Sequence, residues 1–213
     1  MILYLIIGNS INLKKYAFEK DCLIVGVDKG AYLAVKSKLQ IDYAIGDFDS
    51  LNKKEIEFVK KSVKNFVQLD PIKDVTDTFY AYKLLNGPAN RIVILGGIQG
   101  LRIEHFLANI NLLKLDKRVV IQDDYSYISR YDAPATADFL TSDYRFFSFF
   151  ALEKSHITLR GFKYNLDHYL LLENDTLCIS NELSSESGTL FLEDGSCIVV
   201  QSKDDVAFLK SPL

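Results

Sequence analysis

Two aspartates separated by one residue follow a short apolar run in this chain. Asp47 and Asp49 stand in the pentapeptide Gly-Asp-Phe-Asp-Ser, directly after residues 43–45. In extended backbone, residues i and i+2 point to the same side, so both carboxylates would face one cation while Phe48 packs inward. Two carboxylates combined with phosphate oxygens suit Mg²⁺. The alternative is a turn in which the carboxylates only cap backbone groups.

Two further turns would bring charged side chains to the same region. Asp28 and Gly30 follow an apolar run, and the glycine would let a ligand approach the backbone at a helix start. Lys73, Thr76 and Asp77 precede a helical pattern, whose free N–H groups and dipole favour anions. Asp77 is therefore a candidate metal ligand and Lys73 a candidate phosphate partner. The alternative in both turns is a capped helix, with a solvated lysine in the second.

A glycine-rich turn at residues 96–100 leads to Arg102, Glu104 and His105. The guanidinium of Arg102 could grip phosphate oxygens, whereas His105 alone is more typical of a packed or capping histidine. The turn matches neither the P-loop nor the dinucleotide fingerprint. All four turns follow predicted strands and would line one edge of a sheet. An acidic edge with one lysine and one arginine suits a metal-bound nucleotide better than a free anion.

The composition excludes several classes of protein. The 213 residues carry a net charge of −3 without a Lys/Arg block, which argues against a nucleic-acid partner. No apolar run reaches membrane-spanning length, and residues 1–7 predict a buried strand rather than a signal peptide. Three cysteines without paired spacing indicate reduced core thiols in a cytoplasmic protein. The three histidines show no zinc-ligand spacing.

The first half of the chain alternates apolar runs with helical patterns. Strands are expected at residues 2–7, 22–27, 43–45, 65–69, 91–95 and 119–122. Helices are expected at residues 30–38, 53–64, 76–86 and 103–115. This alternation predicts a mostly parallel, Rossmann-like α/β domain over residues 1–130.

The second half contains short β-rich runs separated by turn signals. Strands are expected at residues 146–152, 156–159, 169–172, 177–180, 189–192 and 197–201. This pattern predicts a small antiparallel β-sandwich domain over residues 131–213. We place the domain boundary within residues 131–142, where Pro134 and small or polar residues interrupt the pattern.

The order of these motifs resembles that of the thiamine pyrophosphokinase family, and the resemblance covers nearly the whole chain. The family's Asp-Gly-Gly-Ala, Gly-Asp-Phe-Asp-Ser, Lys-Asp-x-Thr-Asp, Gly-Gly-Arg-x-Asp-His and Ser-Asn-Glu motifs correspond to residues 28–31, 46–50, 73–77, 100–105 and 180–182. Residues 157–164 also resemble the family's Leu-Thr-Leu-x-Gly-Leu-Lys-Tyr segment. The chain departs from the family at Lys29, Leu101 and Glu104, which replace two glycines and an aspartate.

The resemblance implies an enzyme that transfers a diphosphate from ATP to thiamine and releases AMP. It implies Mg²⁺ on Asp47, Asp49 and Asp77, with Arg102 and Lys73 offsetting the charge of the transferred group. Glu104 would orient or deprotonate the thiamine hydroxyl. Nucleotide contacts would come from Asp28, Gly30, Ser50, Thr76 and His105.

The resemblance also implies a homodimer with thiamine between domains of two subunits, where Ser180 and Asn181 contact its aminopyrimidine ring. From the residues alone, Ser180 and Asn181 are better explained as a turn at a strand end.

Two alternatives stay open at this point. A haloacid-dehalogenase-like phosphatase would use Asp47 as a covalent nucleophile, and the later pair Asp123 and Asp124 fits that hypothesis. Against it, at least two predicted strands precede Asp47, whereas that signature normally follows the first strand. A non-catalytic nucleotide- or thiamine-sensing module would keep the pocket without turnover, as the changes at Leu101 and Glu104 allow.

Overall fold

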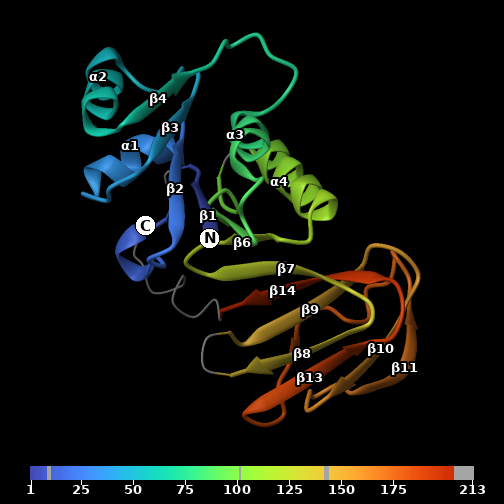
Figure 1. Ribbon diagram of the computed structural model, residues 1–213. Coiled ribbons are helices and arrows are strands. Elements are labelled where there is room, and N and C mark those ends of the chain that lie inside the picture. The colour runs from blue at the N-terminus through green and yellow to red at the C-terminus, as the bar shows by residue number, and fades with distance from the viewer. Residues whose placement is uncertain (9–10, 101, 142–143, 204–213) are drawn as a thin grey trace. The chain divides into compact units, whose positions relative to one another are not determined.

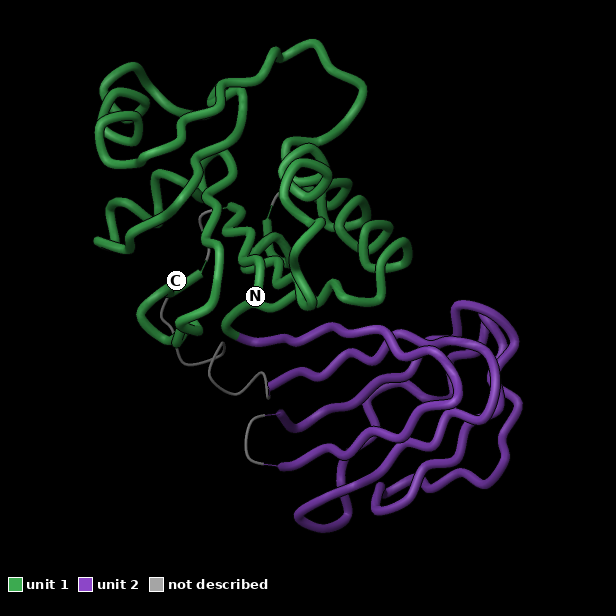
Figure 2. Tube along the Cα trace, in the orientation of Figure 1, with its two compact units in different colours: residues 1–124 green, residues 125–213 purple. Residues whose placement is uncertain are grey.

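The chain forms two compact units, residues 1–124 and 125–213 (Figure 2). The computed structural model describes residues 1–8, 11–100, 102–141 and 144–203. The expected boundary at residues 130/131 falls inside a strand of the second unit, Ser126–Asp132. This strand pairs antiparallel with the strand Ser196–Ser202 along its whole length, and that pairing ties it to the second unit.

The first unit contains a six-stranded parallel sheet in the order β6-β5-β1-β2-β3-β4. Its strands are β1 (Ile2–Ile6), β2 (Cys22–Val27), β3 (Tyr43–Gly46), β4 (Asn65–Gln68), β5 (Arg91–Leu95) and β6 (Val119–Gln122). The strand order reverses between β1 and β5, and ligands of open α/β sheets bind outside the carboxyl ends of the strands at such a point. The predicted parallel α/β fold is confirmed.

Four helices cover the two faces of this sheet. They are α1 (Lys29–Lys36), α2 (Lys53–Ser62), α3 (Asp77–Leu85) and α4 (Ile103–Leu115), and a short 3-10 turn, η1 (Leu13–Lys15), follows β1. Figure 1 shows α1 and α2 on one side of the strands and α3 and α4 on the other. Helix α2 begins with a capping box in which Asn52 and Glu55 satisfy each other's backbone N–H groups.

The second unit is a sandwich of two antiparallel four-stranded arrays, β12-β9-β14-β7 and β11-β10-β13-β8. Its strands are β7 (Ser126–Asp132), β8 (Ala135–Leu140), β9 (Phe146–Ala151), β10 (Ser155–Arg160), β11 (Leu166–Leu171), β12 (Asn181–Glu182), β13 (Ser187–Leu192) and β14 (Ser196–Ser202). Between the sheets, Phe139, Phe147, Phe149 and Phe162 pack edge to face. The predicted antiparallel sandwich is confirmed.

Two expectations for the second unit were wrong in detail. The segment around Pro134 was expected to separate the domains, but it is the turn between β7 and β8. Residues 177–180 were expected to form a strand, but they form an irregular segment whose Cys178 carbonyl accepts a hydrogen bond from the Phe149 N–H at 2.9 Å. In both places the segment is short and polar or mixed in polarity, so contacts with the rest of the fold decide its conformation rather than its local sequence pattern.

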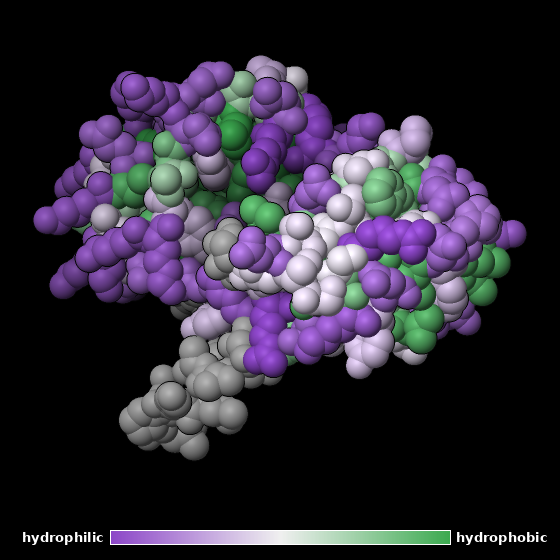
Figure 3. Space-filling view, turned by 90° about the horizontal axis from the view of Figure 1, so that it is seen from below, coloured by the Kyte–Doolittle hydropathy of each residue, from purple (hydrophilic) through white to green (hydrophobic). Residues whose placement is uncertain are grey.

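Hydrophilic residues predominate on the face of the molecule drawn in Figure 3, and apolar residues show there only in small groups. The longest helix, α4, has 13 residues. None of the helices in the described ranges is long and apolar enough to cross a membrane.

Candidate active site

The carboxyl ends of β2 and β3 meet through one close contact. The Asp28 N–H donates to the Ile45 carbonyl at 3.0 Å, and Asp28 Oδ1 accepts from the Phe48 N–H at 3.3 Å. Gly46 makes room for this carboxylate, because a Cβ at residue 46 would lie 1.9 Å from Asp28 Oδ1. The glycine therefore lets the Asp28 side chain lie across the end of β3.

A left-handed residue follows β3. Phe48 has a φ of 56°, is fully buried and stacks on Phe66 with ring centroids 4.8 Å apart. The expectation that Phe48 packs inward is confirmed, but the expectation of extended backbone is wrong. Because the chain turns at Phe48, Asp47 and Asp49 do not point the same way as strand neighbours would. The Asp49 N–H instead donates to Asp47 Oδ1 at 3.2 Å, and Asp49 is exposed.

Three carboxylates from separate turns converge beside this bend. Asp28, Asp47 and Asp77 each offer an oxygen, and these oxygens lie within 4.8 Å of one another. Asp77 is the first residue of α3, whose N-cap Thr76 accepts a hydrogen bond from the Phe79 N–H at 3.2 Å. Among the described residues, this acidic cluster contains Asp28 and not Asp49. Asp28 was expected near the nucleotide but not among the metal ligands.

One lysine lies among these carboxylates. Lys73 Nζ is 3.0 Å from Asp47 Oδ2 and 3.0 Å from Asp77 Oδ1, and it also donates to the Asp70 carbonyl at 3.2 Å. The side chains of Lys73, Asp47 and Asp77 are only 16%, 13% and 17% exposed. The contact to Asp77 is an ion pair without hydrogen-bond geometry, so the buried Asp77 Oδ1 receives no hydrogen bond within the described chain.

Burial and mutual repulsion set the charges of the acidic cluster. Burial, followed by the Asp77 carboxylate, raises the pKa of Asp28 to about 7. Burial also opposes ionisation of Asp47, but the Asp49 N–H and the Lys73 ammonium outweigh it and hold the pKa of Asp47 below its usual value. A single ammonium thus leaves the cluster short of positive charge, and a divalent cation on carboxylate oxygens would supply that charge.

A second polar group lies at the start of α4. Arg102 Nε pairs with Glu104 Oε1 at 2.7 Å, and the two side chains are 72% and 60% exposed. The His105 N–H donates to the Arg102 carbonyl at 3.1 Å, and the His105 side chain is exposed. The hydrogen bond from Arg102 lowers the pKa of Glu104, which is therefore an ionised acceptor. Leu101, the changed residue of this turn, lies outside the described residues.

Two residues expected to contact the nucleotide have other surroundings. A Cβ at Gly30 would lie 2.0 Å from the Ile6 carbonyl oxygen, so this glycine permits close packing of α1 on β1 rather than the approach of a ligand. Ser50 is exposed and precedes α2, whose N-cap is Asn52.

Ser180 and Asn181 lie in the second unit. The Asn181 side chain is buried and is hydrogen-bonded through both of its polar atoms, because its Oδ1 accepts from the Tyr164 N–H at 3.2 Å and its Nδ2 donates to the Tyr164 carbonyl at 2.8 Å. Ser180 has a φ of 55°, and its N–H donates to Ser148 Oγ at 2.9 Å. Asn181 thus positions Tyr164, whose side chain is 71% exposed. Tyr164 was not singled out from the sequence. An aromatic residue at the end of the family-like segment 157–164 could have indicated a residue that contacts a ligand.

Comparison with known proteins identifies both units. Residues 14–122 match the thiamin pyrophosphokinase catalytic domain, and residues 138–196 match the thiamin pyrophosphokinase vitamin B1 binding domain. The thiamine pyrophosphokinase of Bacillus subtilis is 32% identical over 193 residues, which are 87% of this chain and 90% of the relative.

Solved structures give the same result. The crystal structure of the Bacillus subtilis thiamine pyrophosphokinase has a TM-score of 0.84 and 32% identity, covering 96% of this chain and 100% of that one. A thiamin pyrophosphokinase family protein from Enterococcus faecalis has a TM-score of 0.77 and 28% identity, covering 95% and 98% of the two chains. This chain belongs to the thiamine pyrophosphokinase family of enzymes.

Proposed function

We propose that this enzyme transfers the diphosphate of ATP to the hydroxyl of thiamine and releases AMP, with Mg²⁺ held by the acidic cluster. The observation that carries the proposal is the convergence of Asp28, Asp47 and Asp77 from three separate turns around a single lysine. Free ATP would be repelled by these carboxylates, so a divalent cation must accompany it.

The residues of the cluster fit such a cation. Asp77 Oδ1 is buried, and its described close partner is the Lys73 ammonium at 3.0 Å, so a cation already faces this oxygen. Asp47 and Asp77 are the central ligands that we propose, and Asp49 adds an exposed carboxylate one residue beyond Phe48. When bound, Mg²⁺ would neutralise charge on the triphosphate oxygens.

The basic residues would offset charge that develops on the transferred group. Lys73 already lies among the carboxylates, and Arg102 is exposed at the start of α4. Positioned cations of this kind are the main contribution that a protein makes to phosphoryl transfer. The Thr76 hydroxyl accepts from Phe79 and keeps its own proton for a phosphate oxygen. Glu104, ionised, is the proposed acceptor of the thiamine hydroxyl proton.

The second unit would bind thiamine. Tyr164 presents an exposed ring on a turn that Asn181 holds, and such a ring can stack on an aminopyrimidine. Ser180 lies next to Asn181 and would contact the same ring. By family resemblance we propose a homodimer in which the thiamine site uses both subunits. The three free cysteines agree with the proposed cytoplasmic location.

The phosphatase alternative has no support in the structure. Asp47 follows the third strand of the chain, and Asp124, a member of the later acidic pair, accepts hydrogen bonds from the Asn12 N–H and the Tyr16 hydroxyl, which hold the segment around η1. Both family matches also describe thiamin pyrophosphokinase domains.

Product analysis tests the proposal. Purified protein is incubated with Mg²⁺, ATP and thiamine, and the products are separated by chromatography beside a thiamine-free control. We expect thiamine diphosphate and AMP in equal amounts. Inorganic phosphate as the nucleotide-derived product would refute the proposal. Binding of ATP and thiamine without AMP formation would instead select the sensing module.

A further inference from the structure

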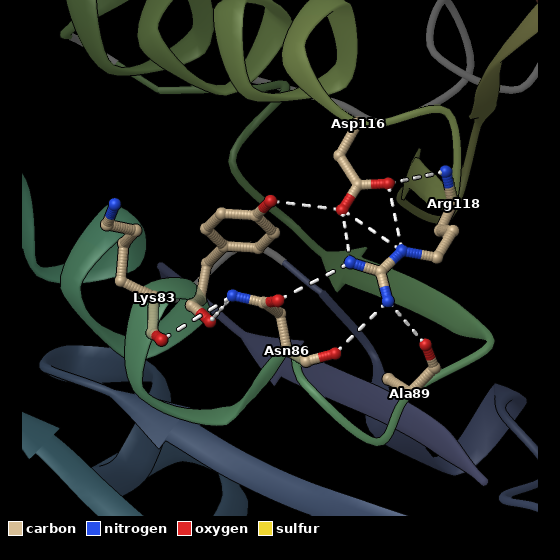
Figure 4. Close-up of polar contacts among 6 residues, drawn as sticks. Lys83, Asn86, Ala89, Asp116 and Arg118 are labelled. Atoms are coloured by element: carbon tan, nitrogen blue, oxygen red, sulfur yellow. Dashed lines mark hydrogen bonds and ion pairs between the residues drawn. The ribbon is translucent and has the colours of Figure 1, made fainter.

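A polar network joins the C-terminal ends of α3 and α4 (Figure 4). Arg118 Nη2 lies 2.6 Å from Asp116 Oδ2, and Arg118 Nε donates to both oxygens of the same carboxylate at 3.0 and 3.1 Å. The Tyr82 hydroxyl, from α3, donates to Asp116 Oδ2 at 3.0 Å. The Asp116 carboxylate, directly after α4, is thus bound by Tyr82 of α3 and by Arg118, the residue before β6.

Arg118 also binds the end of α3. Its Nη1 donates to the Asn86 carbonyl at 3.2 Å and to the Ala89 carbonyl at 2.6 Å. Helix ends leave carbonyls without intrahelical partners, and a cation there interacts favourably with the helix dipole. Arg118 therefore acts as a cap for α3. It also compensates for Asp116, an anion at the C-terminal end of α4 where the dipole alone disfavours one.

The opposite ends of these two helices carry candidate catalytic residues. Asp77 is the first residue of α3, and Glu104 lies in the first turn of α4, next to Arg102. The helices have 9 and 13 residues, so they are about 13 and 20 Å long. A tilt of about 5° at the anchored end would move the other end by about 1 to 2 Å. A misplacement of about 1 Å can reduce turnover by about 100-fold.

We propose that the network of Tyr82, Asp116 and Arg118 positions the active site by fixing the spacing of α3 and α4. It acts at the end of the helices remote from the chemistry and sets the separation of the acidic cluster from the Arg102–Glu104 pair. The proposal rests on the proposed function of these two groups. Tyr82, Asp116 and Arg118 are positioning residues and touch no substrate.

The test compares Arg118→Lys with a matched control. Lysine keeps the charge but lacks the planar fork that binds a carboxylate and two carbonyls at once. Well below the melting temperature of the variant, we expect kcat to fall by about tenfold, with the KM for thiamine changed by less than about twofold. The control is Arg160→Lys, which alters an exposed ion pair with Asp167 in the second unit. We expect it to leave kcat unchanged.

A distance measurement separates positioning from general stability. Spin labels are placed at exposed positions of the two helices, Tyr80→Cys on α3 and Ile103→Cys on α4, in a Cys22→Ser background. We expect Arg118→Lys to broaden the distribution of inter-label distances by about 1 to 2 Å. If Arg118→Lys fails to fold, Tyr82→Phe, which removes one hydroxyl, is measured in its place, with the same expectation.

A lowered melting temperature with unchanged kcat and unchanged inter-label distance would overturn the proposal, because the network would then serve stability alone. Absence of thiamine turnover in the wild type would refute the proposed function instead. The label distances do not depend on turnover, so the two failures are distinguishable.

Discussion

Asp28 is the carboxylate of the acidic cluster whose pKa burial and repulsion raise to about 7, so it is partly protonated at neutral pH. Its Oδ1 lies against Gly46 and accepts the Phe48 N–H, while Asp77 and Asp47 face it from the other turns. The pKa of Asp28 is raised to about 7 by burial first and by Asp77 second. Ionised Asp28 therefore opposes folding unless a cation is present.

This shift gives a pH dependence of stability. An acid with a raised pKa in the folded state destabilises that state as pH rises from its unfolded value, 3.8, through about 7. With metal chelated, we expect Asp28→Asn to match the wild type near pH 4 and to exceed it by about 1 to 3 kcal/mol at pH 8. Urea unfolding at both pH values measures this. A stability difference that does not change with pH would contradict the assignment.

Lys73 supplies the positive charge of the acidic cluster in the absence of a metal. We expect Lys73→Met to lower the free energy of unfolding in chelator by about 1 to 3 kcal/mol, because three carboxylates are left without their cation. Excess Mg²⁺ should then stabilise the variant more than the wild type. Thermal melts with and without Mg²⁺ measure both effects. Lys61→Met, an exposed lysine of α2, is the control, and an equal response of both variants to Mg²⁺ would refute this account.

Sequence reasoning located the acidic residues but not their grouping. It treated Asp47 and Asp49 as neighbours on extended backbone, and the left-handed Phe48 changes that geometry. The Phe48 ring stacks on Phe66 of β4, a contact that local sequence does not reveal. Asp28 joins the cluster because β2 lies beside β3, so its membership depends on strand order.

At the level of the elements, the spacing of apolar residues predicted all four α-helices of the first unit. The N-caps of some of these helices explain where they begin. Thr76 caps α3, as one of the sequence alternatives allowed, and α2 begins after Asn52, at the expected residue 53. Strands β7 and β8 were missed because a proline and small residues masked their alternation. In β8 that alternation is visible once Ala137 and Phe139 are seen to be buried between exposed neighbours.

The contact of α1 with β1 gives a prediction at this scale. A Cβ on Gly30 would lie 2.0 Å from a backbone oxygen of Ile6, so α1 must shift, and Asp28 at its start must shift with it. We expect Gly30→Ala to destabilise the protein by about 1 to 3 kcal/mol and to reduce Mg²⁺-dependent turnover. Gly87→Ala is the matched control, because no atom lies within 4 Å of its added Cβ. Equal stability and activity of the two variants would show that α1 tolerates the shift.

At the scale of the whole molecule, the change of sequence pattern between the halves predicted two units of different architecture, and the structure contains them. The boundary between the two units was harder to place, because β7 begins soon after β6, the last strand of the first unit. The likeness to the Bacillus subtilis structure extends over both units. We therefore assign a role to each unit: the proposed phosphate chemistry lies in the first unit and the proposed thiamine binding in the second.

The proposed homodimer predicts a solution mass of twice the chain mass of 24.2 kDa. Light scattering coupled to size-exclusion chromatography measures it, and turnover is followed across a dilution series through dissociation. If thiamine binds between subunits, specific activity should fall as the dimer dissociates. A monomer with full specific activity would contradict the shared site.

Metal binding tests the central claim most directly. Mn²⁺, a paramagnetic substitute for Mg²⁺, is titrated into the protein with ATP and followed by electron paramagnetic resonance, for the wild type and Asp77→Asn. If carboxylates from separate strand ends hold the ion that carries the nucleotide, the wild type will bind Mn²⁺ with ATP, and Asp77→Asn will bind it at least about tenfold more weakly while remaining folded. Equal Mn²⁺ affinity in the two proteins would contradict the account.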